Sequence, residues 1–153
     1  MSAPVSTWPT AKAALLSLIQ AQVASDTNVG VIYGPPSLGD LAAKDIIAVG
    51  RVLREITAGA LVGNLGAKAL EEIYTIEVTV HVFLGGDQQS SCDTRCATLE
   101  AAVIEAVRAD PTLSGTVNVL SRPVMADVEP SWDEEGSGRW TVATVHIRCH
   151  AQI

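Results

Sequence analysis

The sequence has few aromatic residues and few cysteines. Only 4% of its 153 residues are Phe, Trp or Tyr, so aromatic cages and base-stacking platforms are not expected. Its three cysteines are an odd number without the spacing of a disulfide scaffold, which favours reduced thiols. Packing must therefore come from aliphatic side chains at helical and strand spacing.

Long apolar runs and excess positive charge are also missing. The sequence has no run of about 18 apolar residues and no basic start followed by an apolar core, so neither a membrane span nor a signal peptide is expected. The formal net charge is −7, and sequence-independent affinity for nucleic acid depends on Lys and Arg. Membrane insertion and sequence-specific nucleic-acid binding are both disfavoured.

The sequence contains enough aliphatic side chains to form one hydrophobic core. Hydrophobic residues make up 48% of the chain and charged residues 18%, so the chain is too apolar to be disordered. A length of 153 residues fits one domain. We therefore expect residues 1–153 to form a single domain.

Two amphipathic helices are predicted, at residues 9–23 and 87–109. The first repeats its inward positions at helical spacing, through Lys12, Leu15, Leu16, Ile19 and Val23. In the second, Asp87 is expected to be the N-cap and Asp110-Pro111 the end. Its inward stripe is predicted to be Cys92, Cys96, Leu99, Val103 and Ala106.

Strands are predicted at residues 29–33, 45–53, 73–84, 116–120, 124–128 and 139–151, with a polar loop at 129–138. Alternation is clearest at 73–84. One face of that strand carries Tyr74, Ile76, Val78, Val80, Val82 and Leu84. The other carries Thr75, Glu77, Thr79 and His81. This polar face meets water, a lumen or a neighbouring subunit, and the pattern leaves these alternatives open.

The order of elements predicts an α+β fold, a mostly antiparallel or mixed sheet with both helices on one face. Residues 57–69 are predicted to be a flexible glycine-rich loop, because ordering glycine is entropically costly. Such a loop has little to bury in its own domain. We therefore expect subunit contacts at Gly59, Gly63, Asn64 and Gly66, together with Thr75, Glu77, Thr79 and His81.

No catalytic or metal motif is complete. Cys92 and Cys96 have the i, i+4 spacing of a helix stripe rather than the short loop spacing of zinc ligands, so they are expected in the core. The segment 59–68 lacks the Gly-Lys-Ser/Thr of a phosphate loop. The acidic stretches 71–72 and 133–135 lack the spacing of a calcium loop and are expected in exposed turns.

Histidines and tryptophans also have ordinary explanations. His146 and His150 share a strand face with Arg148 between them, and solvated or interface roles are favoured over catalysis. Trp132 and Trp140 flank an acidic turn, where core or rim packing explains them better than base stacking.

Taken in order, the segments resemble the tail-terminator proteins of long-tailed phages, particularly those of actinobacteria, over nearly the whole chain. The resemblance rests on the opening helix, Val31-Ile32-Tyr33-Gly34-Pro35-Pro36, the strand 46–53, Leu65-Gly66, Glu71-Glu72-Ile73-Tyr74-Thr75-Ile76-Glu77-Val78, Gly85-Gly86-Asp87-Gln88-Gln89, and Ala109-Asp110-Pro111-Thr112-Leu113-Ser114-Gly115.

That resemblance implies a structural subunit rather than an enzyme, with no cofactor and no catalytic residue. It implies a homo-oligomeric ring, a hexamer, which caps the tail-tube protein, stops tube polymerisation and offers a surface to head-completion and neck proteins. DNA can pass through such a ring. The implied location is the head-proximal end of the virion tail, after assembly in the host cytoplasm.

Two alternatives stay open. A neck or tail-tube component of the same virion would share fold and composition. A small enzyme that uses Cys149 with His146 or His150 is the other alternative.

The absence of a ligand set with sound spacing generates a first prediction. The purified protein should contain no stoichiometric metal, and its melting temperature should not change in chelator. Elemental analysis and thermal unfolding with and without chelator check this. About one zinc per chain, with unfolding on chelation, would contradict it.

Overall fold

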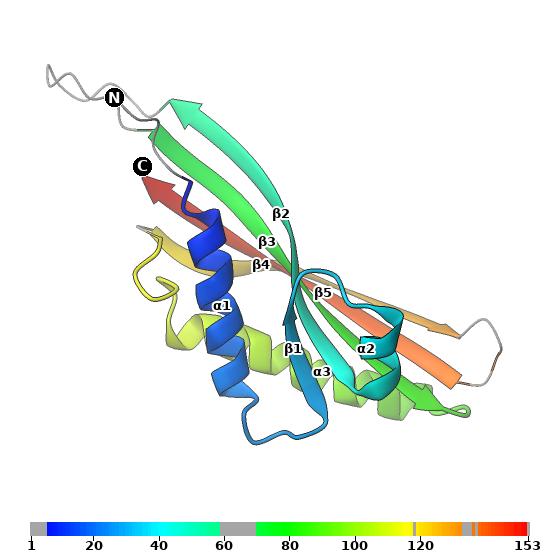
Figure 1. The fold of residues 1–153 in the computed structure, drawn as a ribbon. Helices are drawn as coiled ribbons and strands as arrows, with labels where there is room; N and C mark the ends of the chain where they lie inside the picture. Colours follow the sequence, from blue (N-terminus) through cyan, green and yellow to red (C-terminus); the bar gives the residue numbers. More distant parts are fainter. Residues whose placement is uncertain (1–5, 59–69, 118, 133–135, 137, 153) are drawn as a thin grey trace, which may run out of the picture.

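A computed structural model describes residues 6–152, except 59–69, 118, 133–135 and 137. Three helices and one five-stranded sheet make up the described part (Figure 1). The helices are α1 (Trp8–Gln22), α2 (Leu38–Ala43) and α3 (Gln89–Ala109). The strands are β1 (Val29–Tyr33), β2 (Asp45–Ala58), β3 (Leu70–Gly85), β4 (Val119–Trp132) and β5 (Gly138–Gln152). Their order in the sheet is β1-β2-β3-β5-β4. Among the described strands only β1 and β2 pair in parallel, so the α+β fold with a mixed, mostly antiparallel sheet is confirmed.

Strand β3 separates a buried face of the sheet from a face that carries no long helix and is contacted by α2. Every second residue from Glu72 to Val82 is buried, and the residues between are half-buried. Strand β5 continues the buried face with Ala143, Val145, Ile147 and Cys149. Helices α1 and α3 bury their apolar stripes in the same core cluster. The predicted packing of both helices on one face is therefore confirmed.

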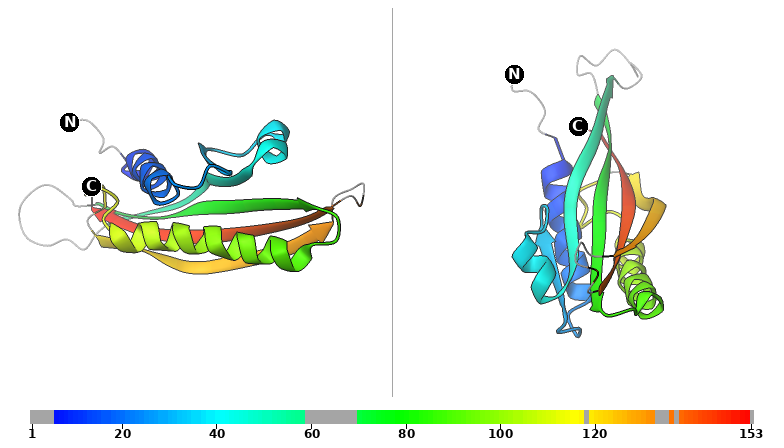
Figure 2. Two further views of the ribbon diagram at one scale, coloured as in Figure 1. Left: turned by 90° about the horizontal axis from the view of Figure 1, so that it is seen from below. Right: turned by 90° about the vertical axis from the view of Figure 1, so that its right-hand side faces the viewer.

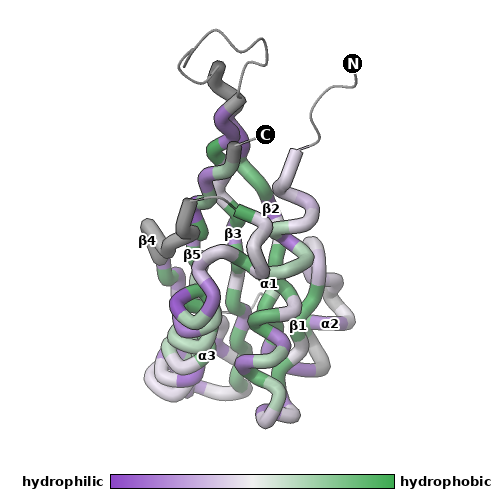
Figure 3. The backbone as a smooth tube through the Cα atoms, turned by 90° about the vertical axis from the view of Figure 1, so that its left-hand side faces the viewer, coloured by the Kyte–Doolittle hydropathy of each residue, from purple (hydrophilic) through white to green (hydrophobic). Residues whose placement is uncertain are grey.

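The sheet is strongly twisted, and the helices follow the twist. Figure 1 shows the strands crossing near the middle of the sheet, with the end of β2, the start of β3 and the end of β5 at one end beside the start of α1. Helix α1 contacts β1 and β2, α3 contacts β3, β5 and β4, and the two helices also contact each other. In Figure 3 most of the strongly hydrophobic residues lie on the strands, whereas α3 is paler and partly hydrophilic. No helix of the described residues is long and apolar enough to span a membrane.

The start of α1 is held by a buried carboxylate. Glu72 of β3 is 0% exposed and accepts hydrogen bonds from the Thr7 backbone N–H (3.0 Å), the Thr7 hydroxyl (3.1 Å) and the Ser6 hydroxyl. The guanidinium Nε of Arg54, on β2, lies 2.9 Å from the same carboxylate. An acid beside the first N–H groups of a helix is electrostatically favourable. This contact therefore joins α1 to two strands.

Helix α2 was not predicted, although the sequence carries its signal. Ser37 and Asp40 form a capping box, in which each side chain accepts a hydrogen bond from the other residue's backbone N–H. The helix packs against β2 and β3, on the opposite side of the sheet from α3 (Figure 2). Ile46 and Ala48 of β2 lie outside the main core cluster and are still buried, at 4% and 1% exposure.

Several predicted boundaries were wrong. Strand β2 runs to Ala58, so Thr57 and Ala58 belong to a strand and not to the glycine loop. The two predicted strands at 116–120 and 124–128 are one strand, β4, which continues into the predicted polar loop at 129–138. Bulges interrupt its apolar pattern and conceal the continuity. Asp87 is not the cap of α3, because Gln88 holds that position and the Asp87 carboxylate lies 3.0 Å from Arg139.

The network at Glu72 generates a stability prediction. Burial disfavours the charged form, but hydrogen bonds from Ser6 and Thr7 and the charge of Arg54 outweigh it and lower the pKa of Glu72 below its ordinary 4.5. Glu72→Gln should lower the free energy of unfolding by about 1.5–3 kcal/mol, the value of hydrogen bonds to a charged group. Urea unfolding at pH 7 measures it.

The direction of the Glu72 pKa shift determines how its contribution to stability changes with pH. A lowered carboxyl pKa stabilises the fold above pH 4.5, and this stabilisation is lost as the pH falls through the lowered value. The difference between wild type and Glu72→Gln should therefore shrink in acid. Glu71→Gln, on the opposite face of β3, is the control and should change stability by about 0.5 kcal/mol or less. Equal effects of the two substitutions would contradict the assigned role of Glu72.

Candidate assembly surface

The face of the sheet turned away from α1 and α3 carries the predicted polar residues. Thr75, Glu77, Thr79 and His81 alternate with buried residues of β3 and are half-buried themselves. On β5 the same face carries His146, Arg148 and His150, paired in register with Glu77, Thr75 and Ile73. The predicted placement of these side chains on one face is confirmed. Their use between subunits stays a prediction.

Ion pairs run across three strands of this face. His146 on β5 lies between Glu77 on β3 and Asp127 on β4, with a distance of 3.7 Å from a ring nitrogen to each carboxylate. His150 lies 3.6 Å from Glu71 by the same measure. Each pair strengthens when the imidazole is protonated, because cross-strand pairs of opposite charge attract. The face is therefore a mixed-charge surface on a rigid support.

His81 differs from the other two histidines. Its Nε2 lies 3.0 Å from the hydroxyl of Thr79, within hydrogen-bond distance. Burial lowers its pKa, so the ring is neutral at pH 7. His81 therefore adds a polar but uncharged group to this face.

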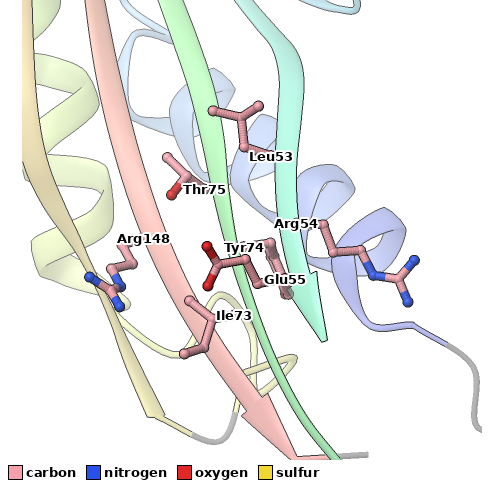
Figure 4. A pocket seen from close by; sticks show the side chains of 7 residues that line it. All are labelled: Leu53, Arg54, Glu55, Ile73, Tyr74, Thr75 and Arg148. Carbon is pink, nitrogen blue, oxygen red and sulfur yellow. The ribbon is translucent and has the colours of Figure 1, made fainter. Parts of the chain in front are cut away.

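A groove of about 520 Å³ lies at the β2 side of this face, and seven residues line it: Leu53, Arg54, Glu55, Ile73, Tyr74, Thr75 and Arg148. Figure 4 shows them on β2, β3 and β5. The lining combines aliphatic carbon, exposed at Leu53 and half-buried at Ile73, with charges of both signs, at Glu55 and Arg148. Such a lining suits contact with a protein surface. Sequence reasoning missed Leu53 as a surface residue, because it was placed at the end of an apolar run.

The three thiols face the core. Cys92, Cys96 and Cys149 are 0%, 1% and 0% exposed, which confirms the predicted stripe of α3. Cys149 lies on the buried face of β5, whereas His146 and His150 lie on the opposite face, so this strand does not bring thiol and imidazole together. Among the residues that the structure describes, no group of three or more His, Cys, Asp and Glu side chains is placed to hold a metal.

Other predicted features have mixed outcomes. Glu71 and Glu72 lie within β3 on opposite faces, so the predicted exposed turn was wrong there. The rings of Trp140 and Phe83 pack with centroids 4.8 Å apart, in accord with rim packing. The contact residues Gly59, Gly63, Asn64 and Gly66 and the acids 133–135 lie outside the described residues.

Thiol reactivity follows from this burial. Burial raises the pKa of Cys96 to about 11 and that of Cys149 to about 12, so almost no thiolate exists at pH 8. Thiolate is the reactive form, and native labelling should be about 100-fold slower than labelling in denaturant. A time course with a chromogenic thiol reagent checks this. Rapid labelling of all three native thiols would contradict the assigned orientation of α3 and β5.

Comparisons with known proteins do not assign a family. No protein-family model matches the chain, and no curated protein matches it. Among solved structures, a chain described as "Virion of native gene transfer agent (GTA) particle" is similar at 15% sequence identity. The alignment covers 92% of this chain and 94% of that chain, with a TM-score of 0.38.

Proposed function

We propose that this chain is a structural subunit of a phage virion that forms a ring on the end of the tail tube and stops its growth. The order of sequence segments resembles tail terminators, and one structural observation supports an assembly role. That observation is the sheet face without a long helix, with its groove and its strand-to-strand ion pairs. Mixed polar and aliphatic surfaces of this kind are typical of contacts between proteins.

The physics of a ring fits a rigid sheet. A heterologous contact uses two different surfaces of one subunit, and repetition of the same rotation closes a ring. Surfaces on strands keep their geometry, so the rotation is the same at every step. In this proposal Thr75, Glu77, Thr79 and His81 contact the tube or a neighbouring subunit. Residues Gly59, Gly63, Asn64 and Gly66 make further contacts in the assembly. The outer surface of the ring then meets head-completion proteins.

A substitution in the groove tests this proposal. Thr75→Arg places a large cation beside Arg148, and capping of tail tubes should be lost while the free energy of unfolding changes by about 1 kcal/mol or less. Electron microscopy of tail tubes grown with the purified protein measures tube length. Wild type should give tubes of uniform length with a ring at one end.

Thr98→Arg is the matched control, because Thr98 is exposed on α3. Its tubes should be capped normally. Wild-type protein that neither binds tube ends nor limits their length would refute the terminator function, and binding to the neck instead would favour the neck alternative. Normal capping by a folded Thr75→Arg variant would remove the groove from the contact.

A further inference from the structure

The first edge of the sheet is only partly covered. Strand β1 has five residues and pairs with β2 only as far as Tyr33↔Val49. Strand β2 continues to Ala58, and from Val52 onward it pairs with β3 on one side. No described strand pairs with its other side there. An open edge with unpaired backbone groups is a template for another chain.

The second edge of the sheet is β4. This strand has 14 residues and pairs with β5, and no strand in the described part of the chain lies beyond it. Pro123 and Pro130 lie within it, and proline is confined to edge strands because it has no N–H to donate. The prolines limit any added pairing to the residues between them, which include Asp127, Val128 and Glu129.

Exposed large hydrophobic side chains gather at these two edges. Three are found among the described residues: Tyr33 at 50%, Leu53 at 43% and Val128 at 51% exposure. Tyr33 ends β1 and Leu53 lies on the open part of β2, so both belong to the first edge. Val128 belongs to the second edge. Each edge therefore has an exposed apolar side chain that a second protein surface can contact.

The charges at the two edges are complementary. Near the first edge, Arg51 and Lys44 are exposed and have no ion pair within the described ranges, and the ammonium of Lys12 lies 4.1 Å from the ring centroid of Tyr33. Glu55 is an exposed acid on the same edge. The positively charged part of the edge is therefore limited to the region around Arg51. On the second edge, Glu129 is exposed, and the side chain of Asp127 is 59% exposed. One edge thus offers cations and the other offers acids.

We propose that the β2 edge of one copy docks on the β4 edge of a second copy, with Arg51 facing Asp127 and Glu129. This inference deepens the proposed function, on which it rests, by assigning the subunit contact to the sheet edges. The contact is head-to-tail, because each copy contributes a different edge. Repeated around an axis, it leaves the polar residues of β3 and β5 accessible to other proteins, and the groove borders the contact because Leu53 and Glu55 belong to both.

Edge charges have another known use, since charges on an edge strand also keep proteins apart. The two roles predict opposite results for charge reversal. If the charges only prevent association, replacing Arg51 leaves a monomer and mixing variants changes nothing. If the edges dock, reversal on one edge weakens association and a matching reversal on the other edge restores it.

Two variants of the full chain carry out this test, Arg51→Glu and Glu129→Arg. Each alone places like charges at the docked edges and should weaken self-association about tenfold or more, as measured by sedimentation equilibrium over a range of concentrations. An equimolar mixture has one complementary pair at every contact in an alternating arrangement, so its association should return to about the wild-type level. High salt should weaken the wild-type contact.

Controls with the same charge changes lie on the exposed side of α3. Arg108→Glu and Glu105→Arg, at side chains 73% and 54% exposed, should associate like wild type, which separates local contact from net charge. Two-state unfolding of each variant confirms that it folds.

Each outcome decides the docking proposal. Three results would overturn it. The wild type could be monomeric at every concentration, the two charge-reversed variants could associate as strongly as the wild type, or their equimolar mixture could fail to regain the wild-type association. Recovery when Arg51→Glu is mixed with wild type instead would indicate a symmetric contact of like edges, and would overturn it too. These solution measurements do not depend on tail tubes. If charge reversal at the edges does not change self-association but the protein still caps tubes, the docking proposal fails and the proposed function stands. If the edges dock but the protein does not cap tubes, only the proposed function fails.

Discussion

The two neighbours of β3 are the constraint from which most of the architecture follows. Because β2 pairs with this strand from Leu70 to His81 and β5 pairs with it from Glu71 to Gly85, most of its backbone is bonded within the sheet and its two faces remain for other contacts. Side chains alternate strictly between those faces, so burying Tyr74, Ile76, Val78, Val80 and Val82 forces the intervening residues onto the other side. A one-residue slip would exchange the faces and expose the core, which fixes the register.

Covering the apolar face then decides where the helices lie. Helix α3 supplies a stripe of small and aliphatic residues over β3, β5 and β4, and α1 completes the layer over β1 and β2. The Glu72 carboxylate gives α1 a defined position, because it sits on the buried face of β3 and binds the residues that begin the helix. A buried carboxylate without these donors would be strongly unfavourable. Apolar packing and one charged network therefore act on the same helix.

The remaining surfaces divide between one face and two edges. The face without a long helix presents a groove and imidazole–carboxylate pairs. The edges differ in length, charge and exposed carbon, since β1 stops short of the end of β2 whereas β4 runs far along β5. In the proposed ring, the two unlike edges contact the two neighbouring subunits, and the separate face is left for other proteins.

Four features could be predicted from the sequence: the fold class, the central strand with its two faces, both long helices and the burial of the thiols. Each of these depends on periodic local patterns that a linear sequence displays. It did not determine the extents of β2 and β4, because bulges shift the alternation, and it missed α2, whose six residues are too few for periodicity. Only the tertiary structure placed Glu72 beside Thr7 and Arg54, turned Cys149 away from His146, and left Leu53 exposed at an open edge. These features depend on which strands become neighbours, and contacts between residues far apart along the chain leave no periodic trace in it.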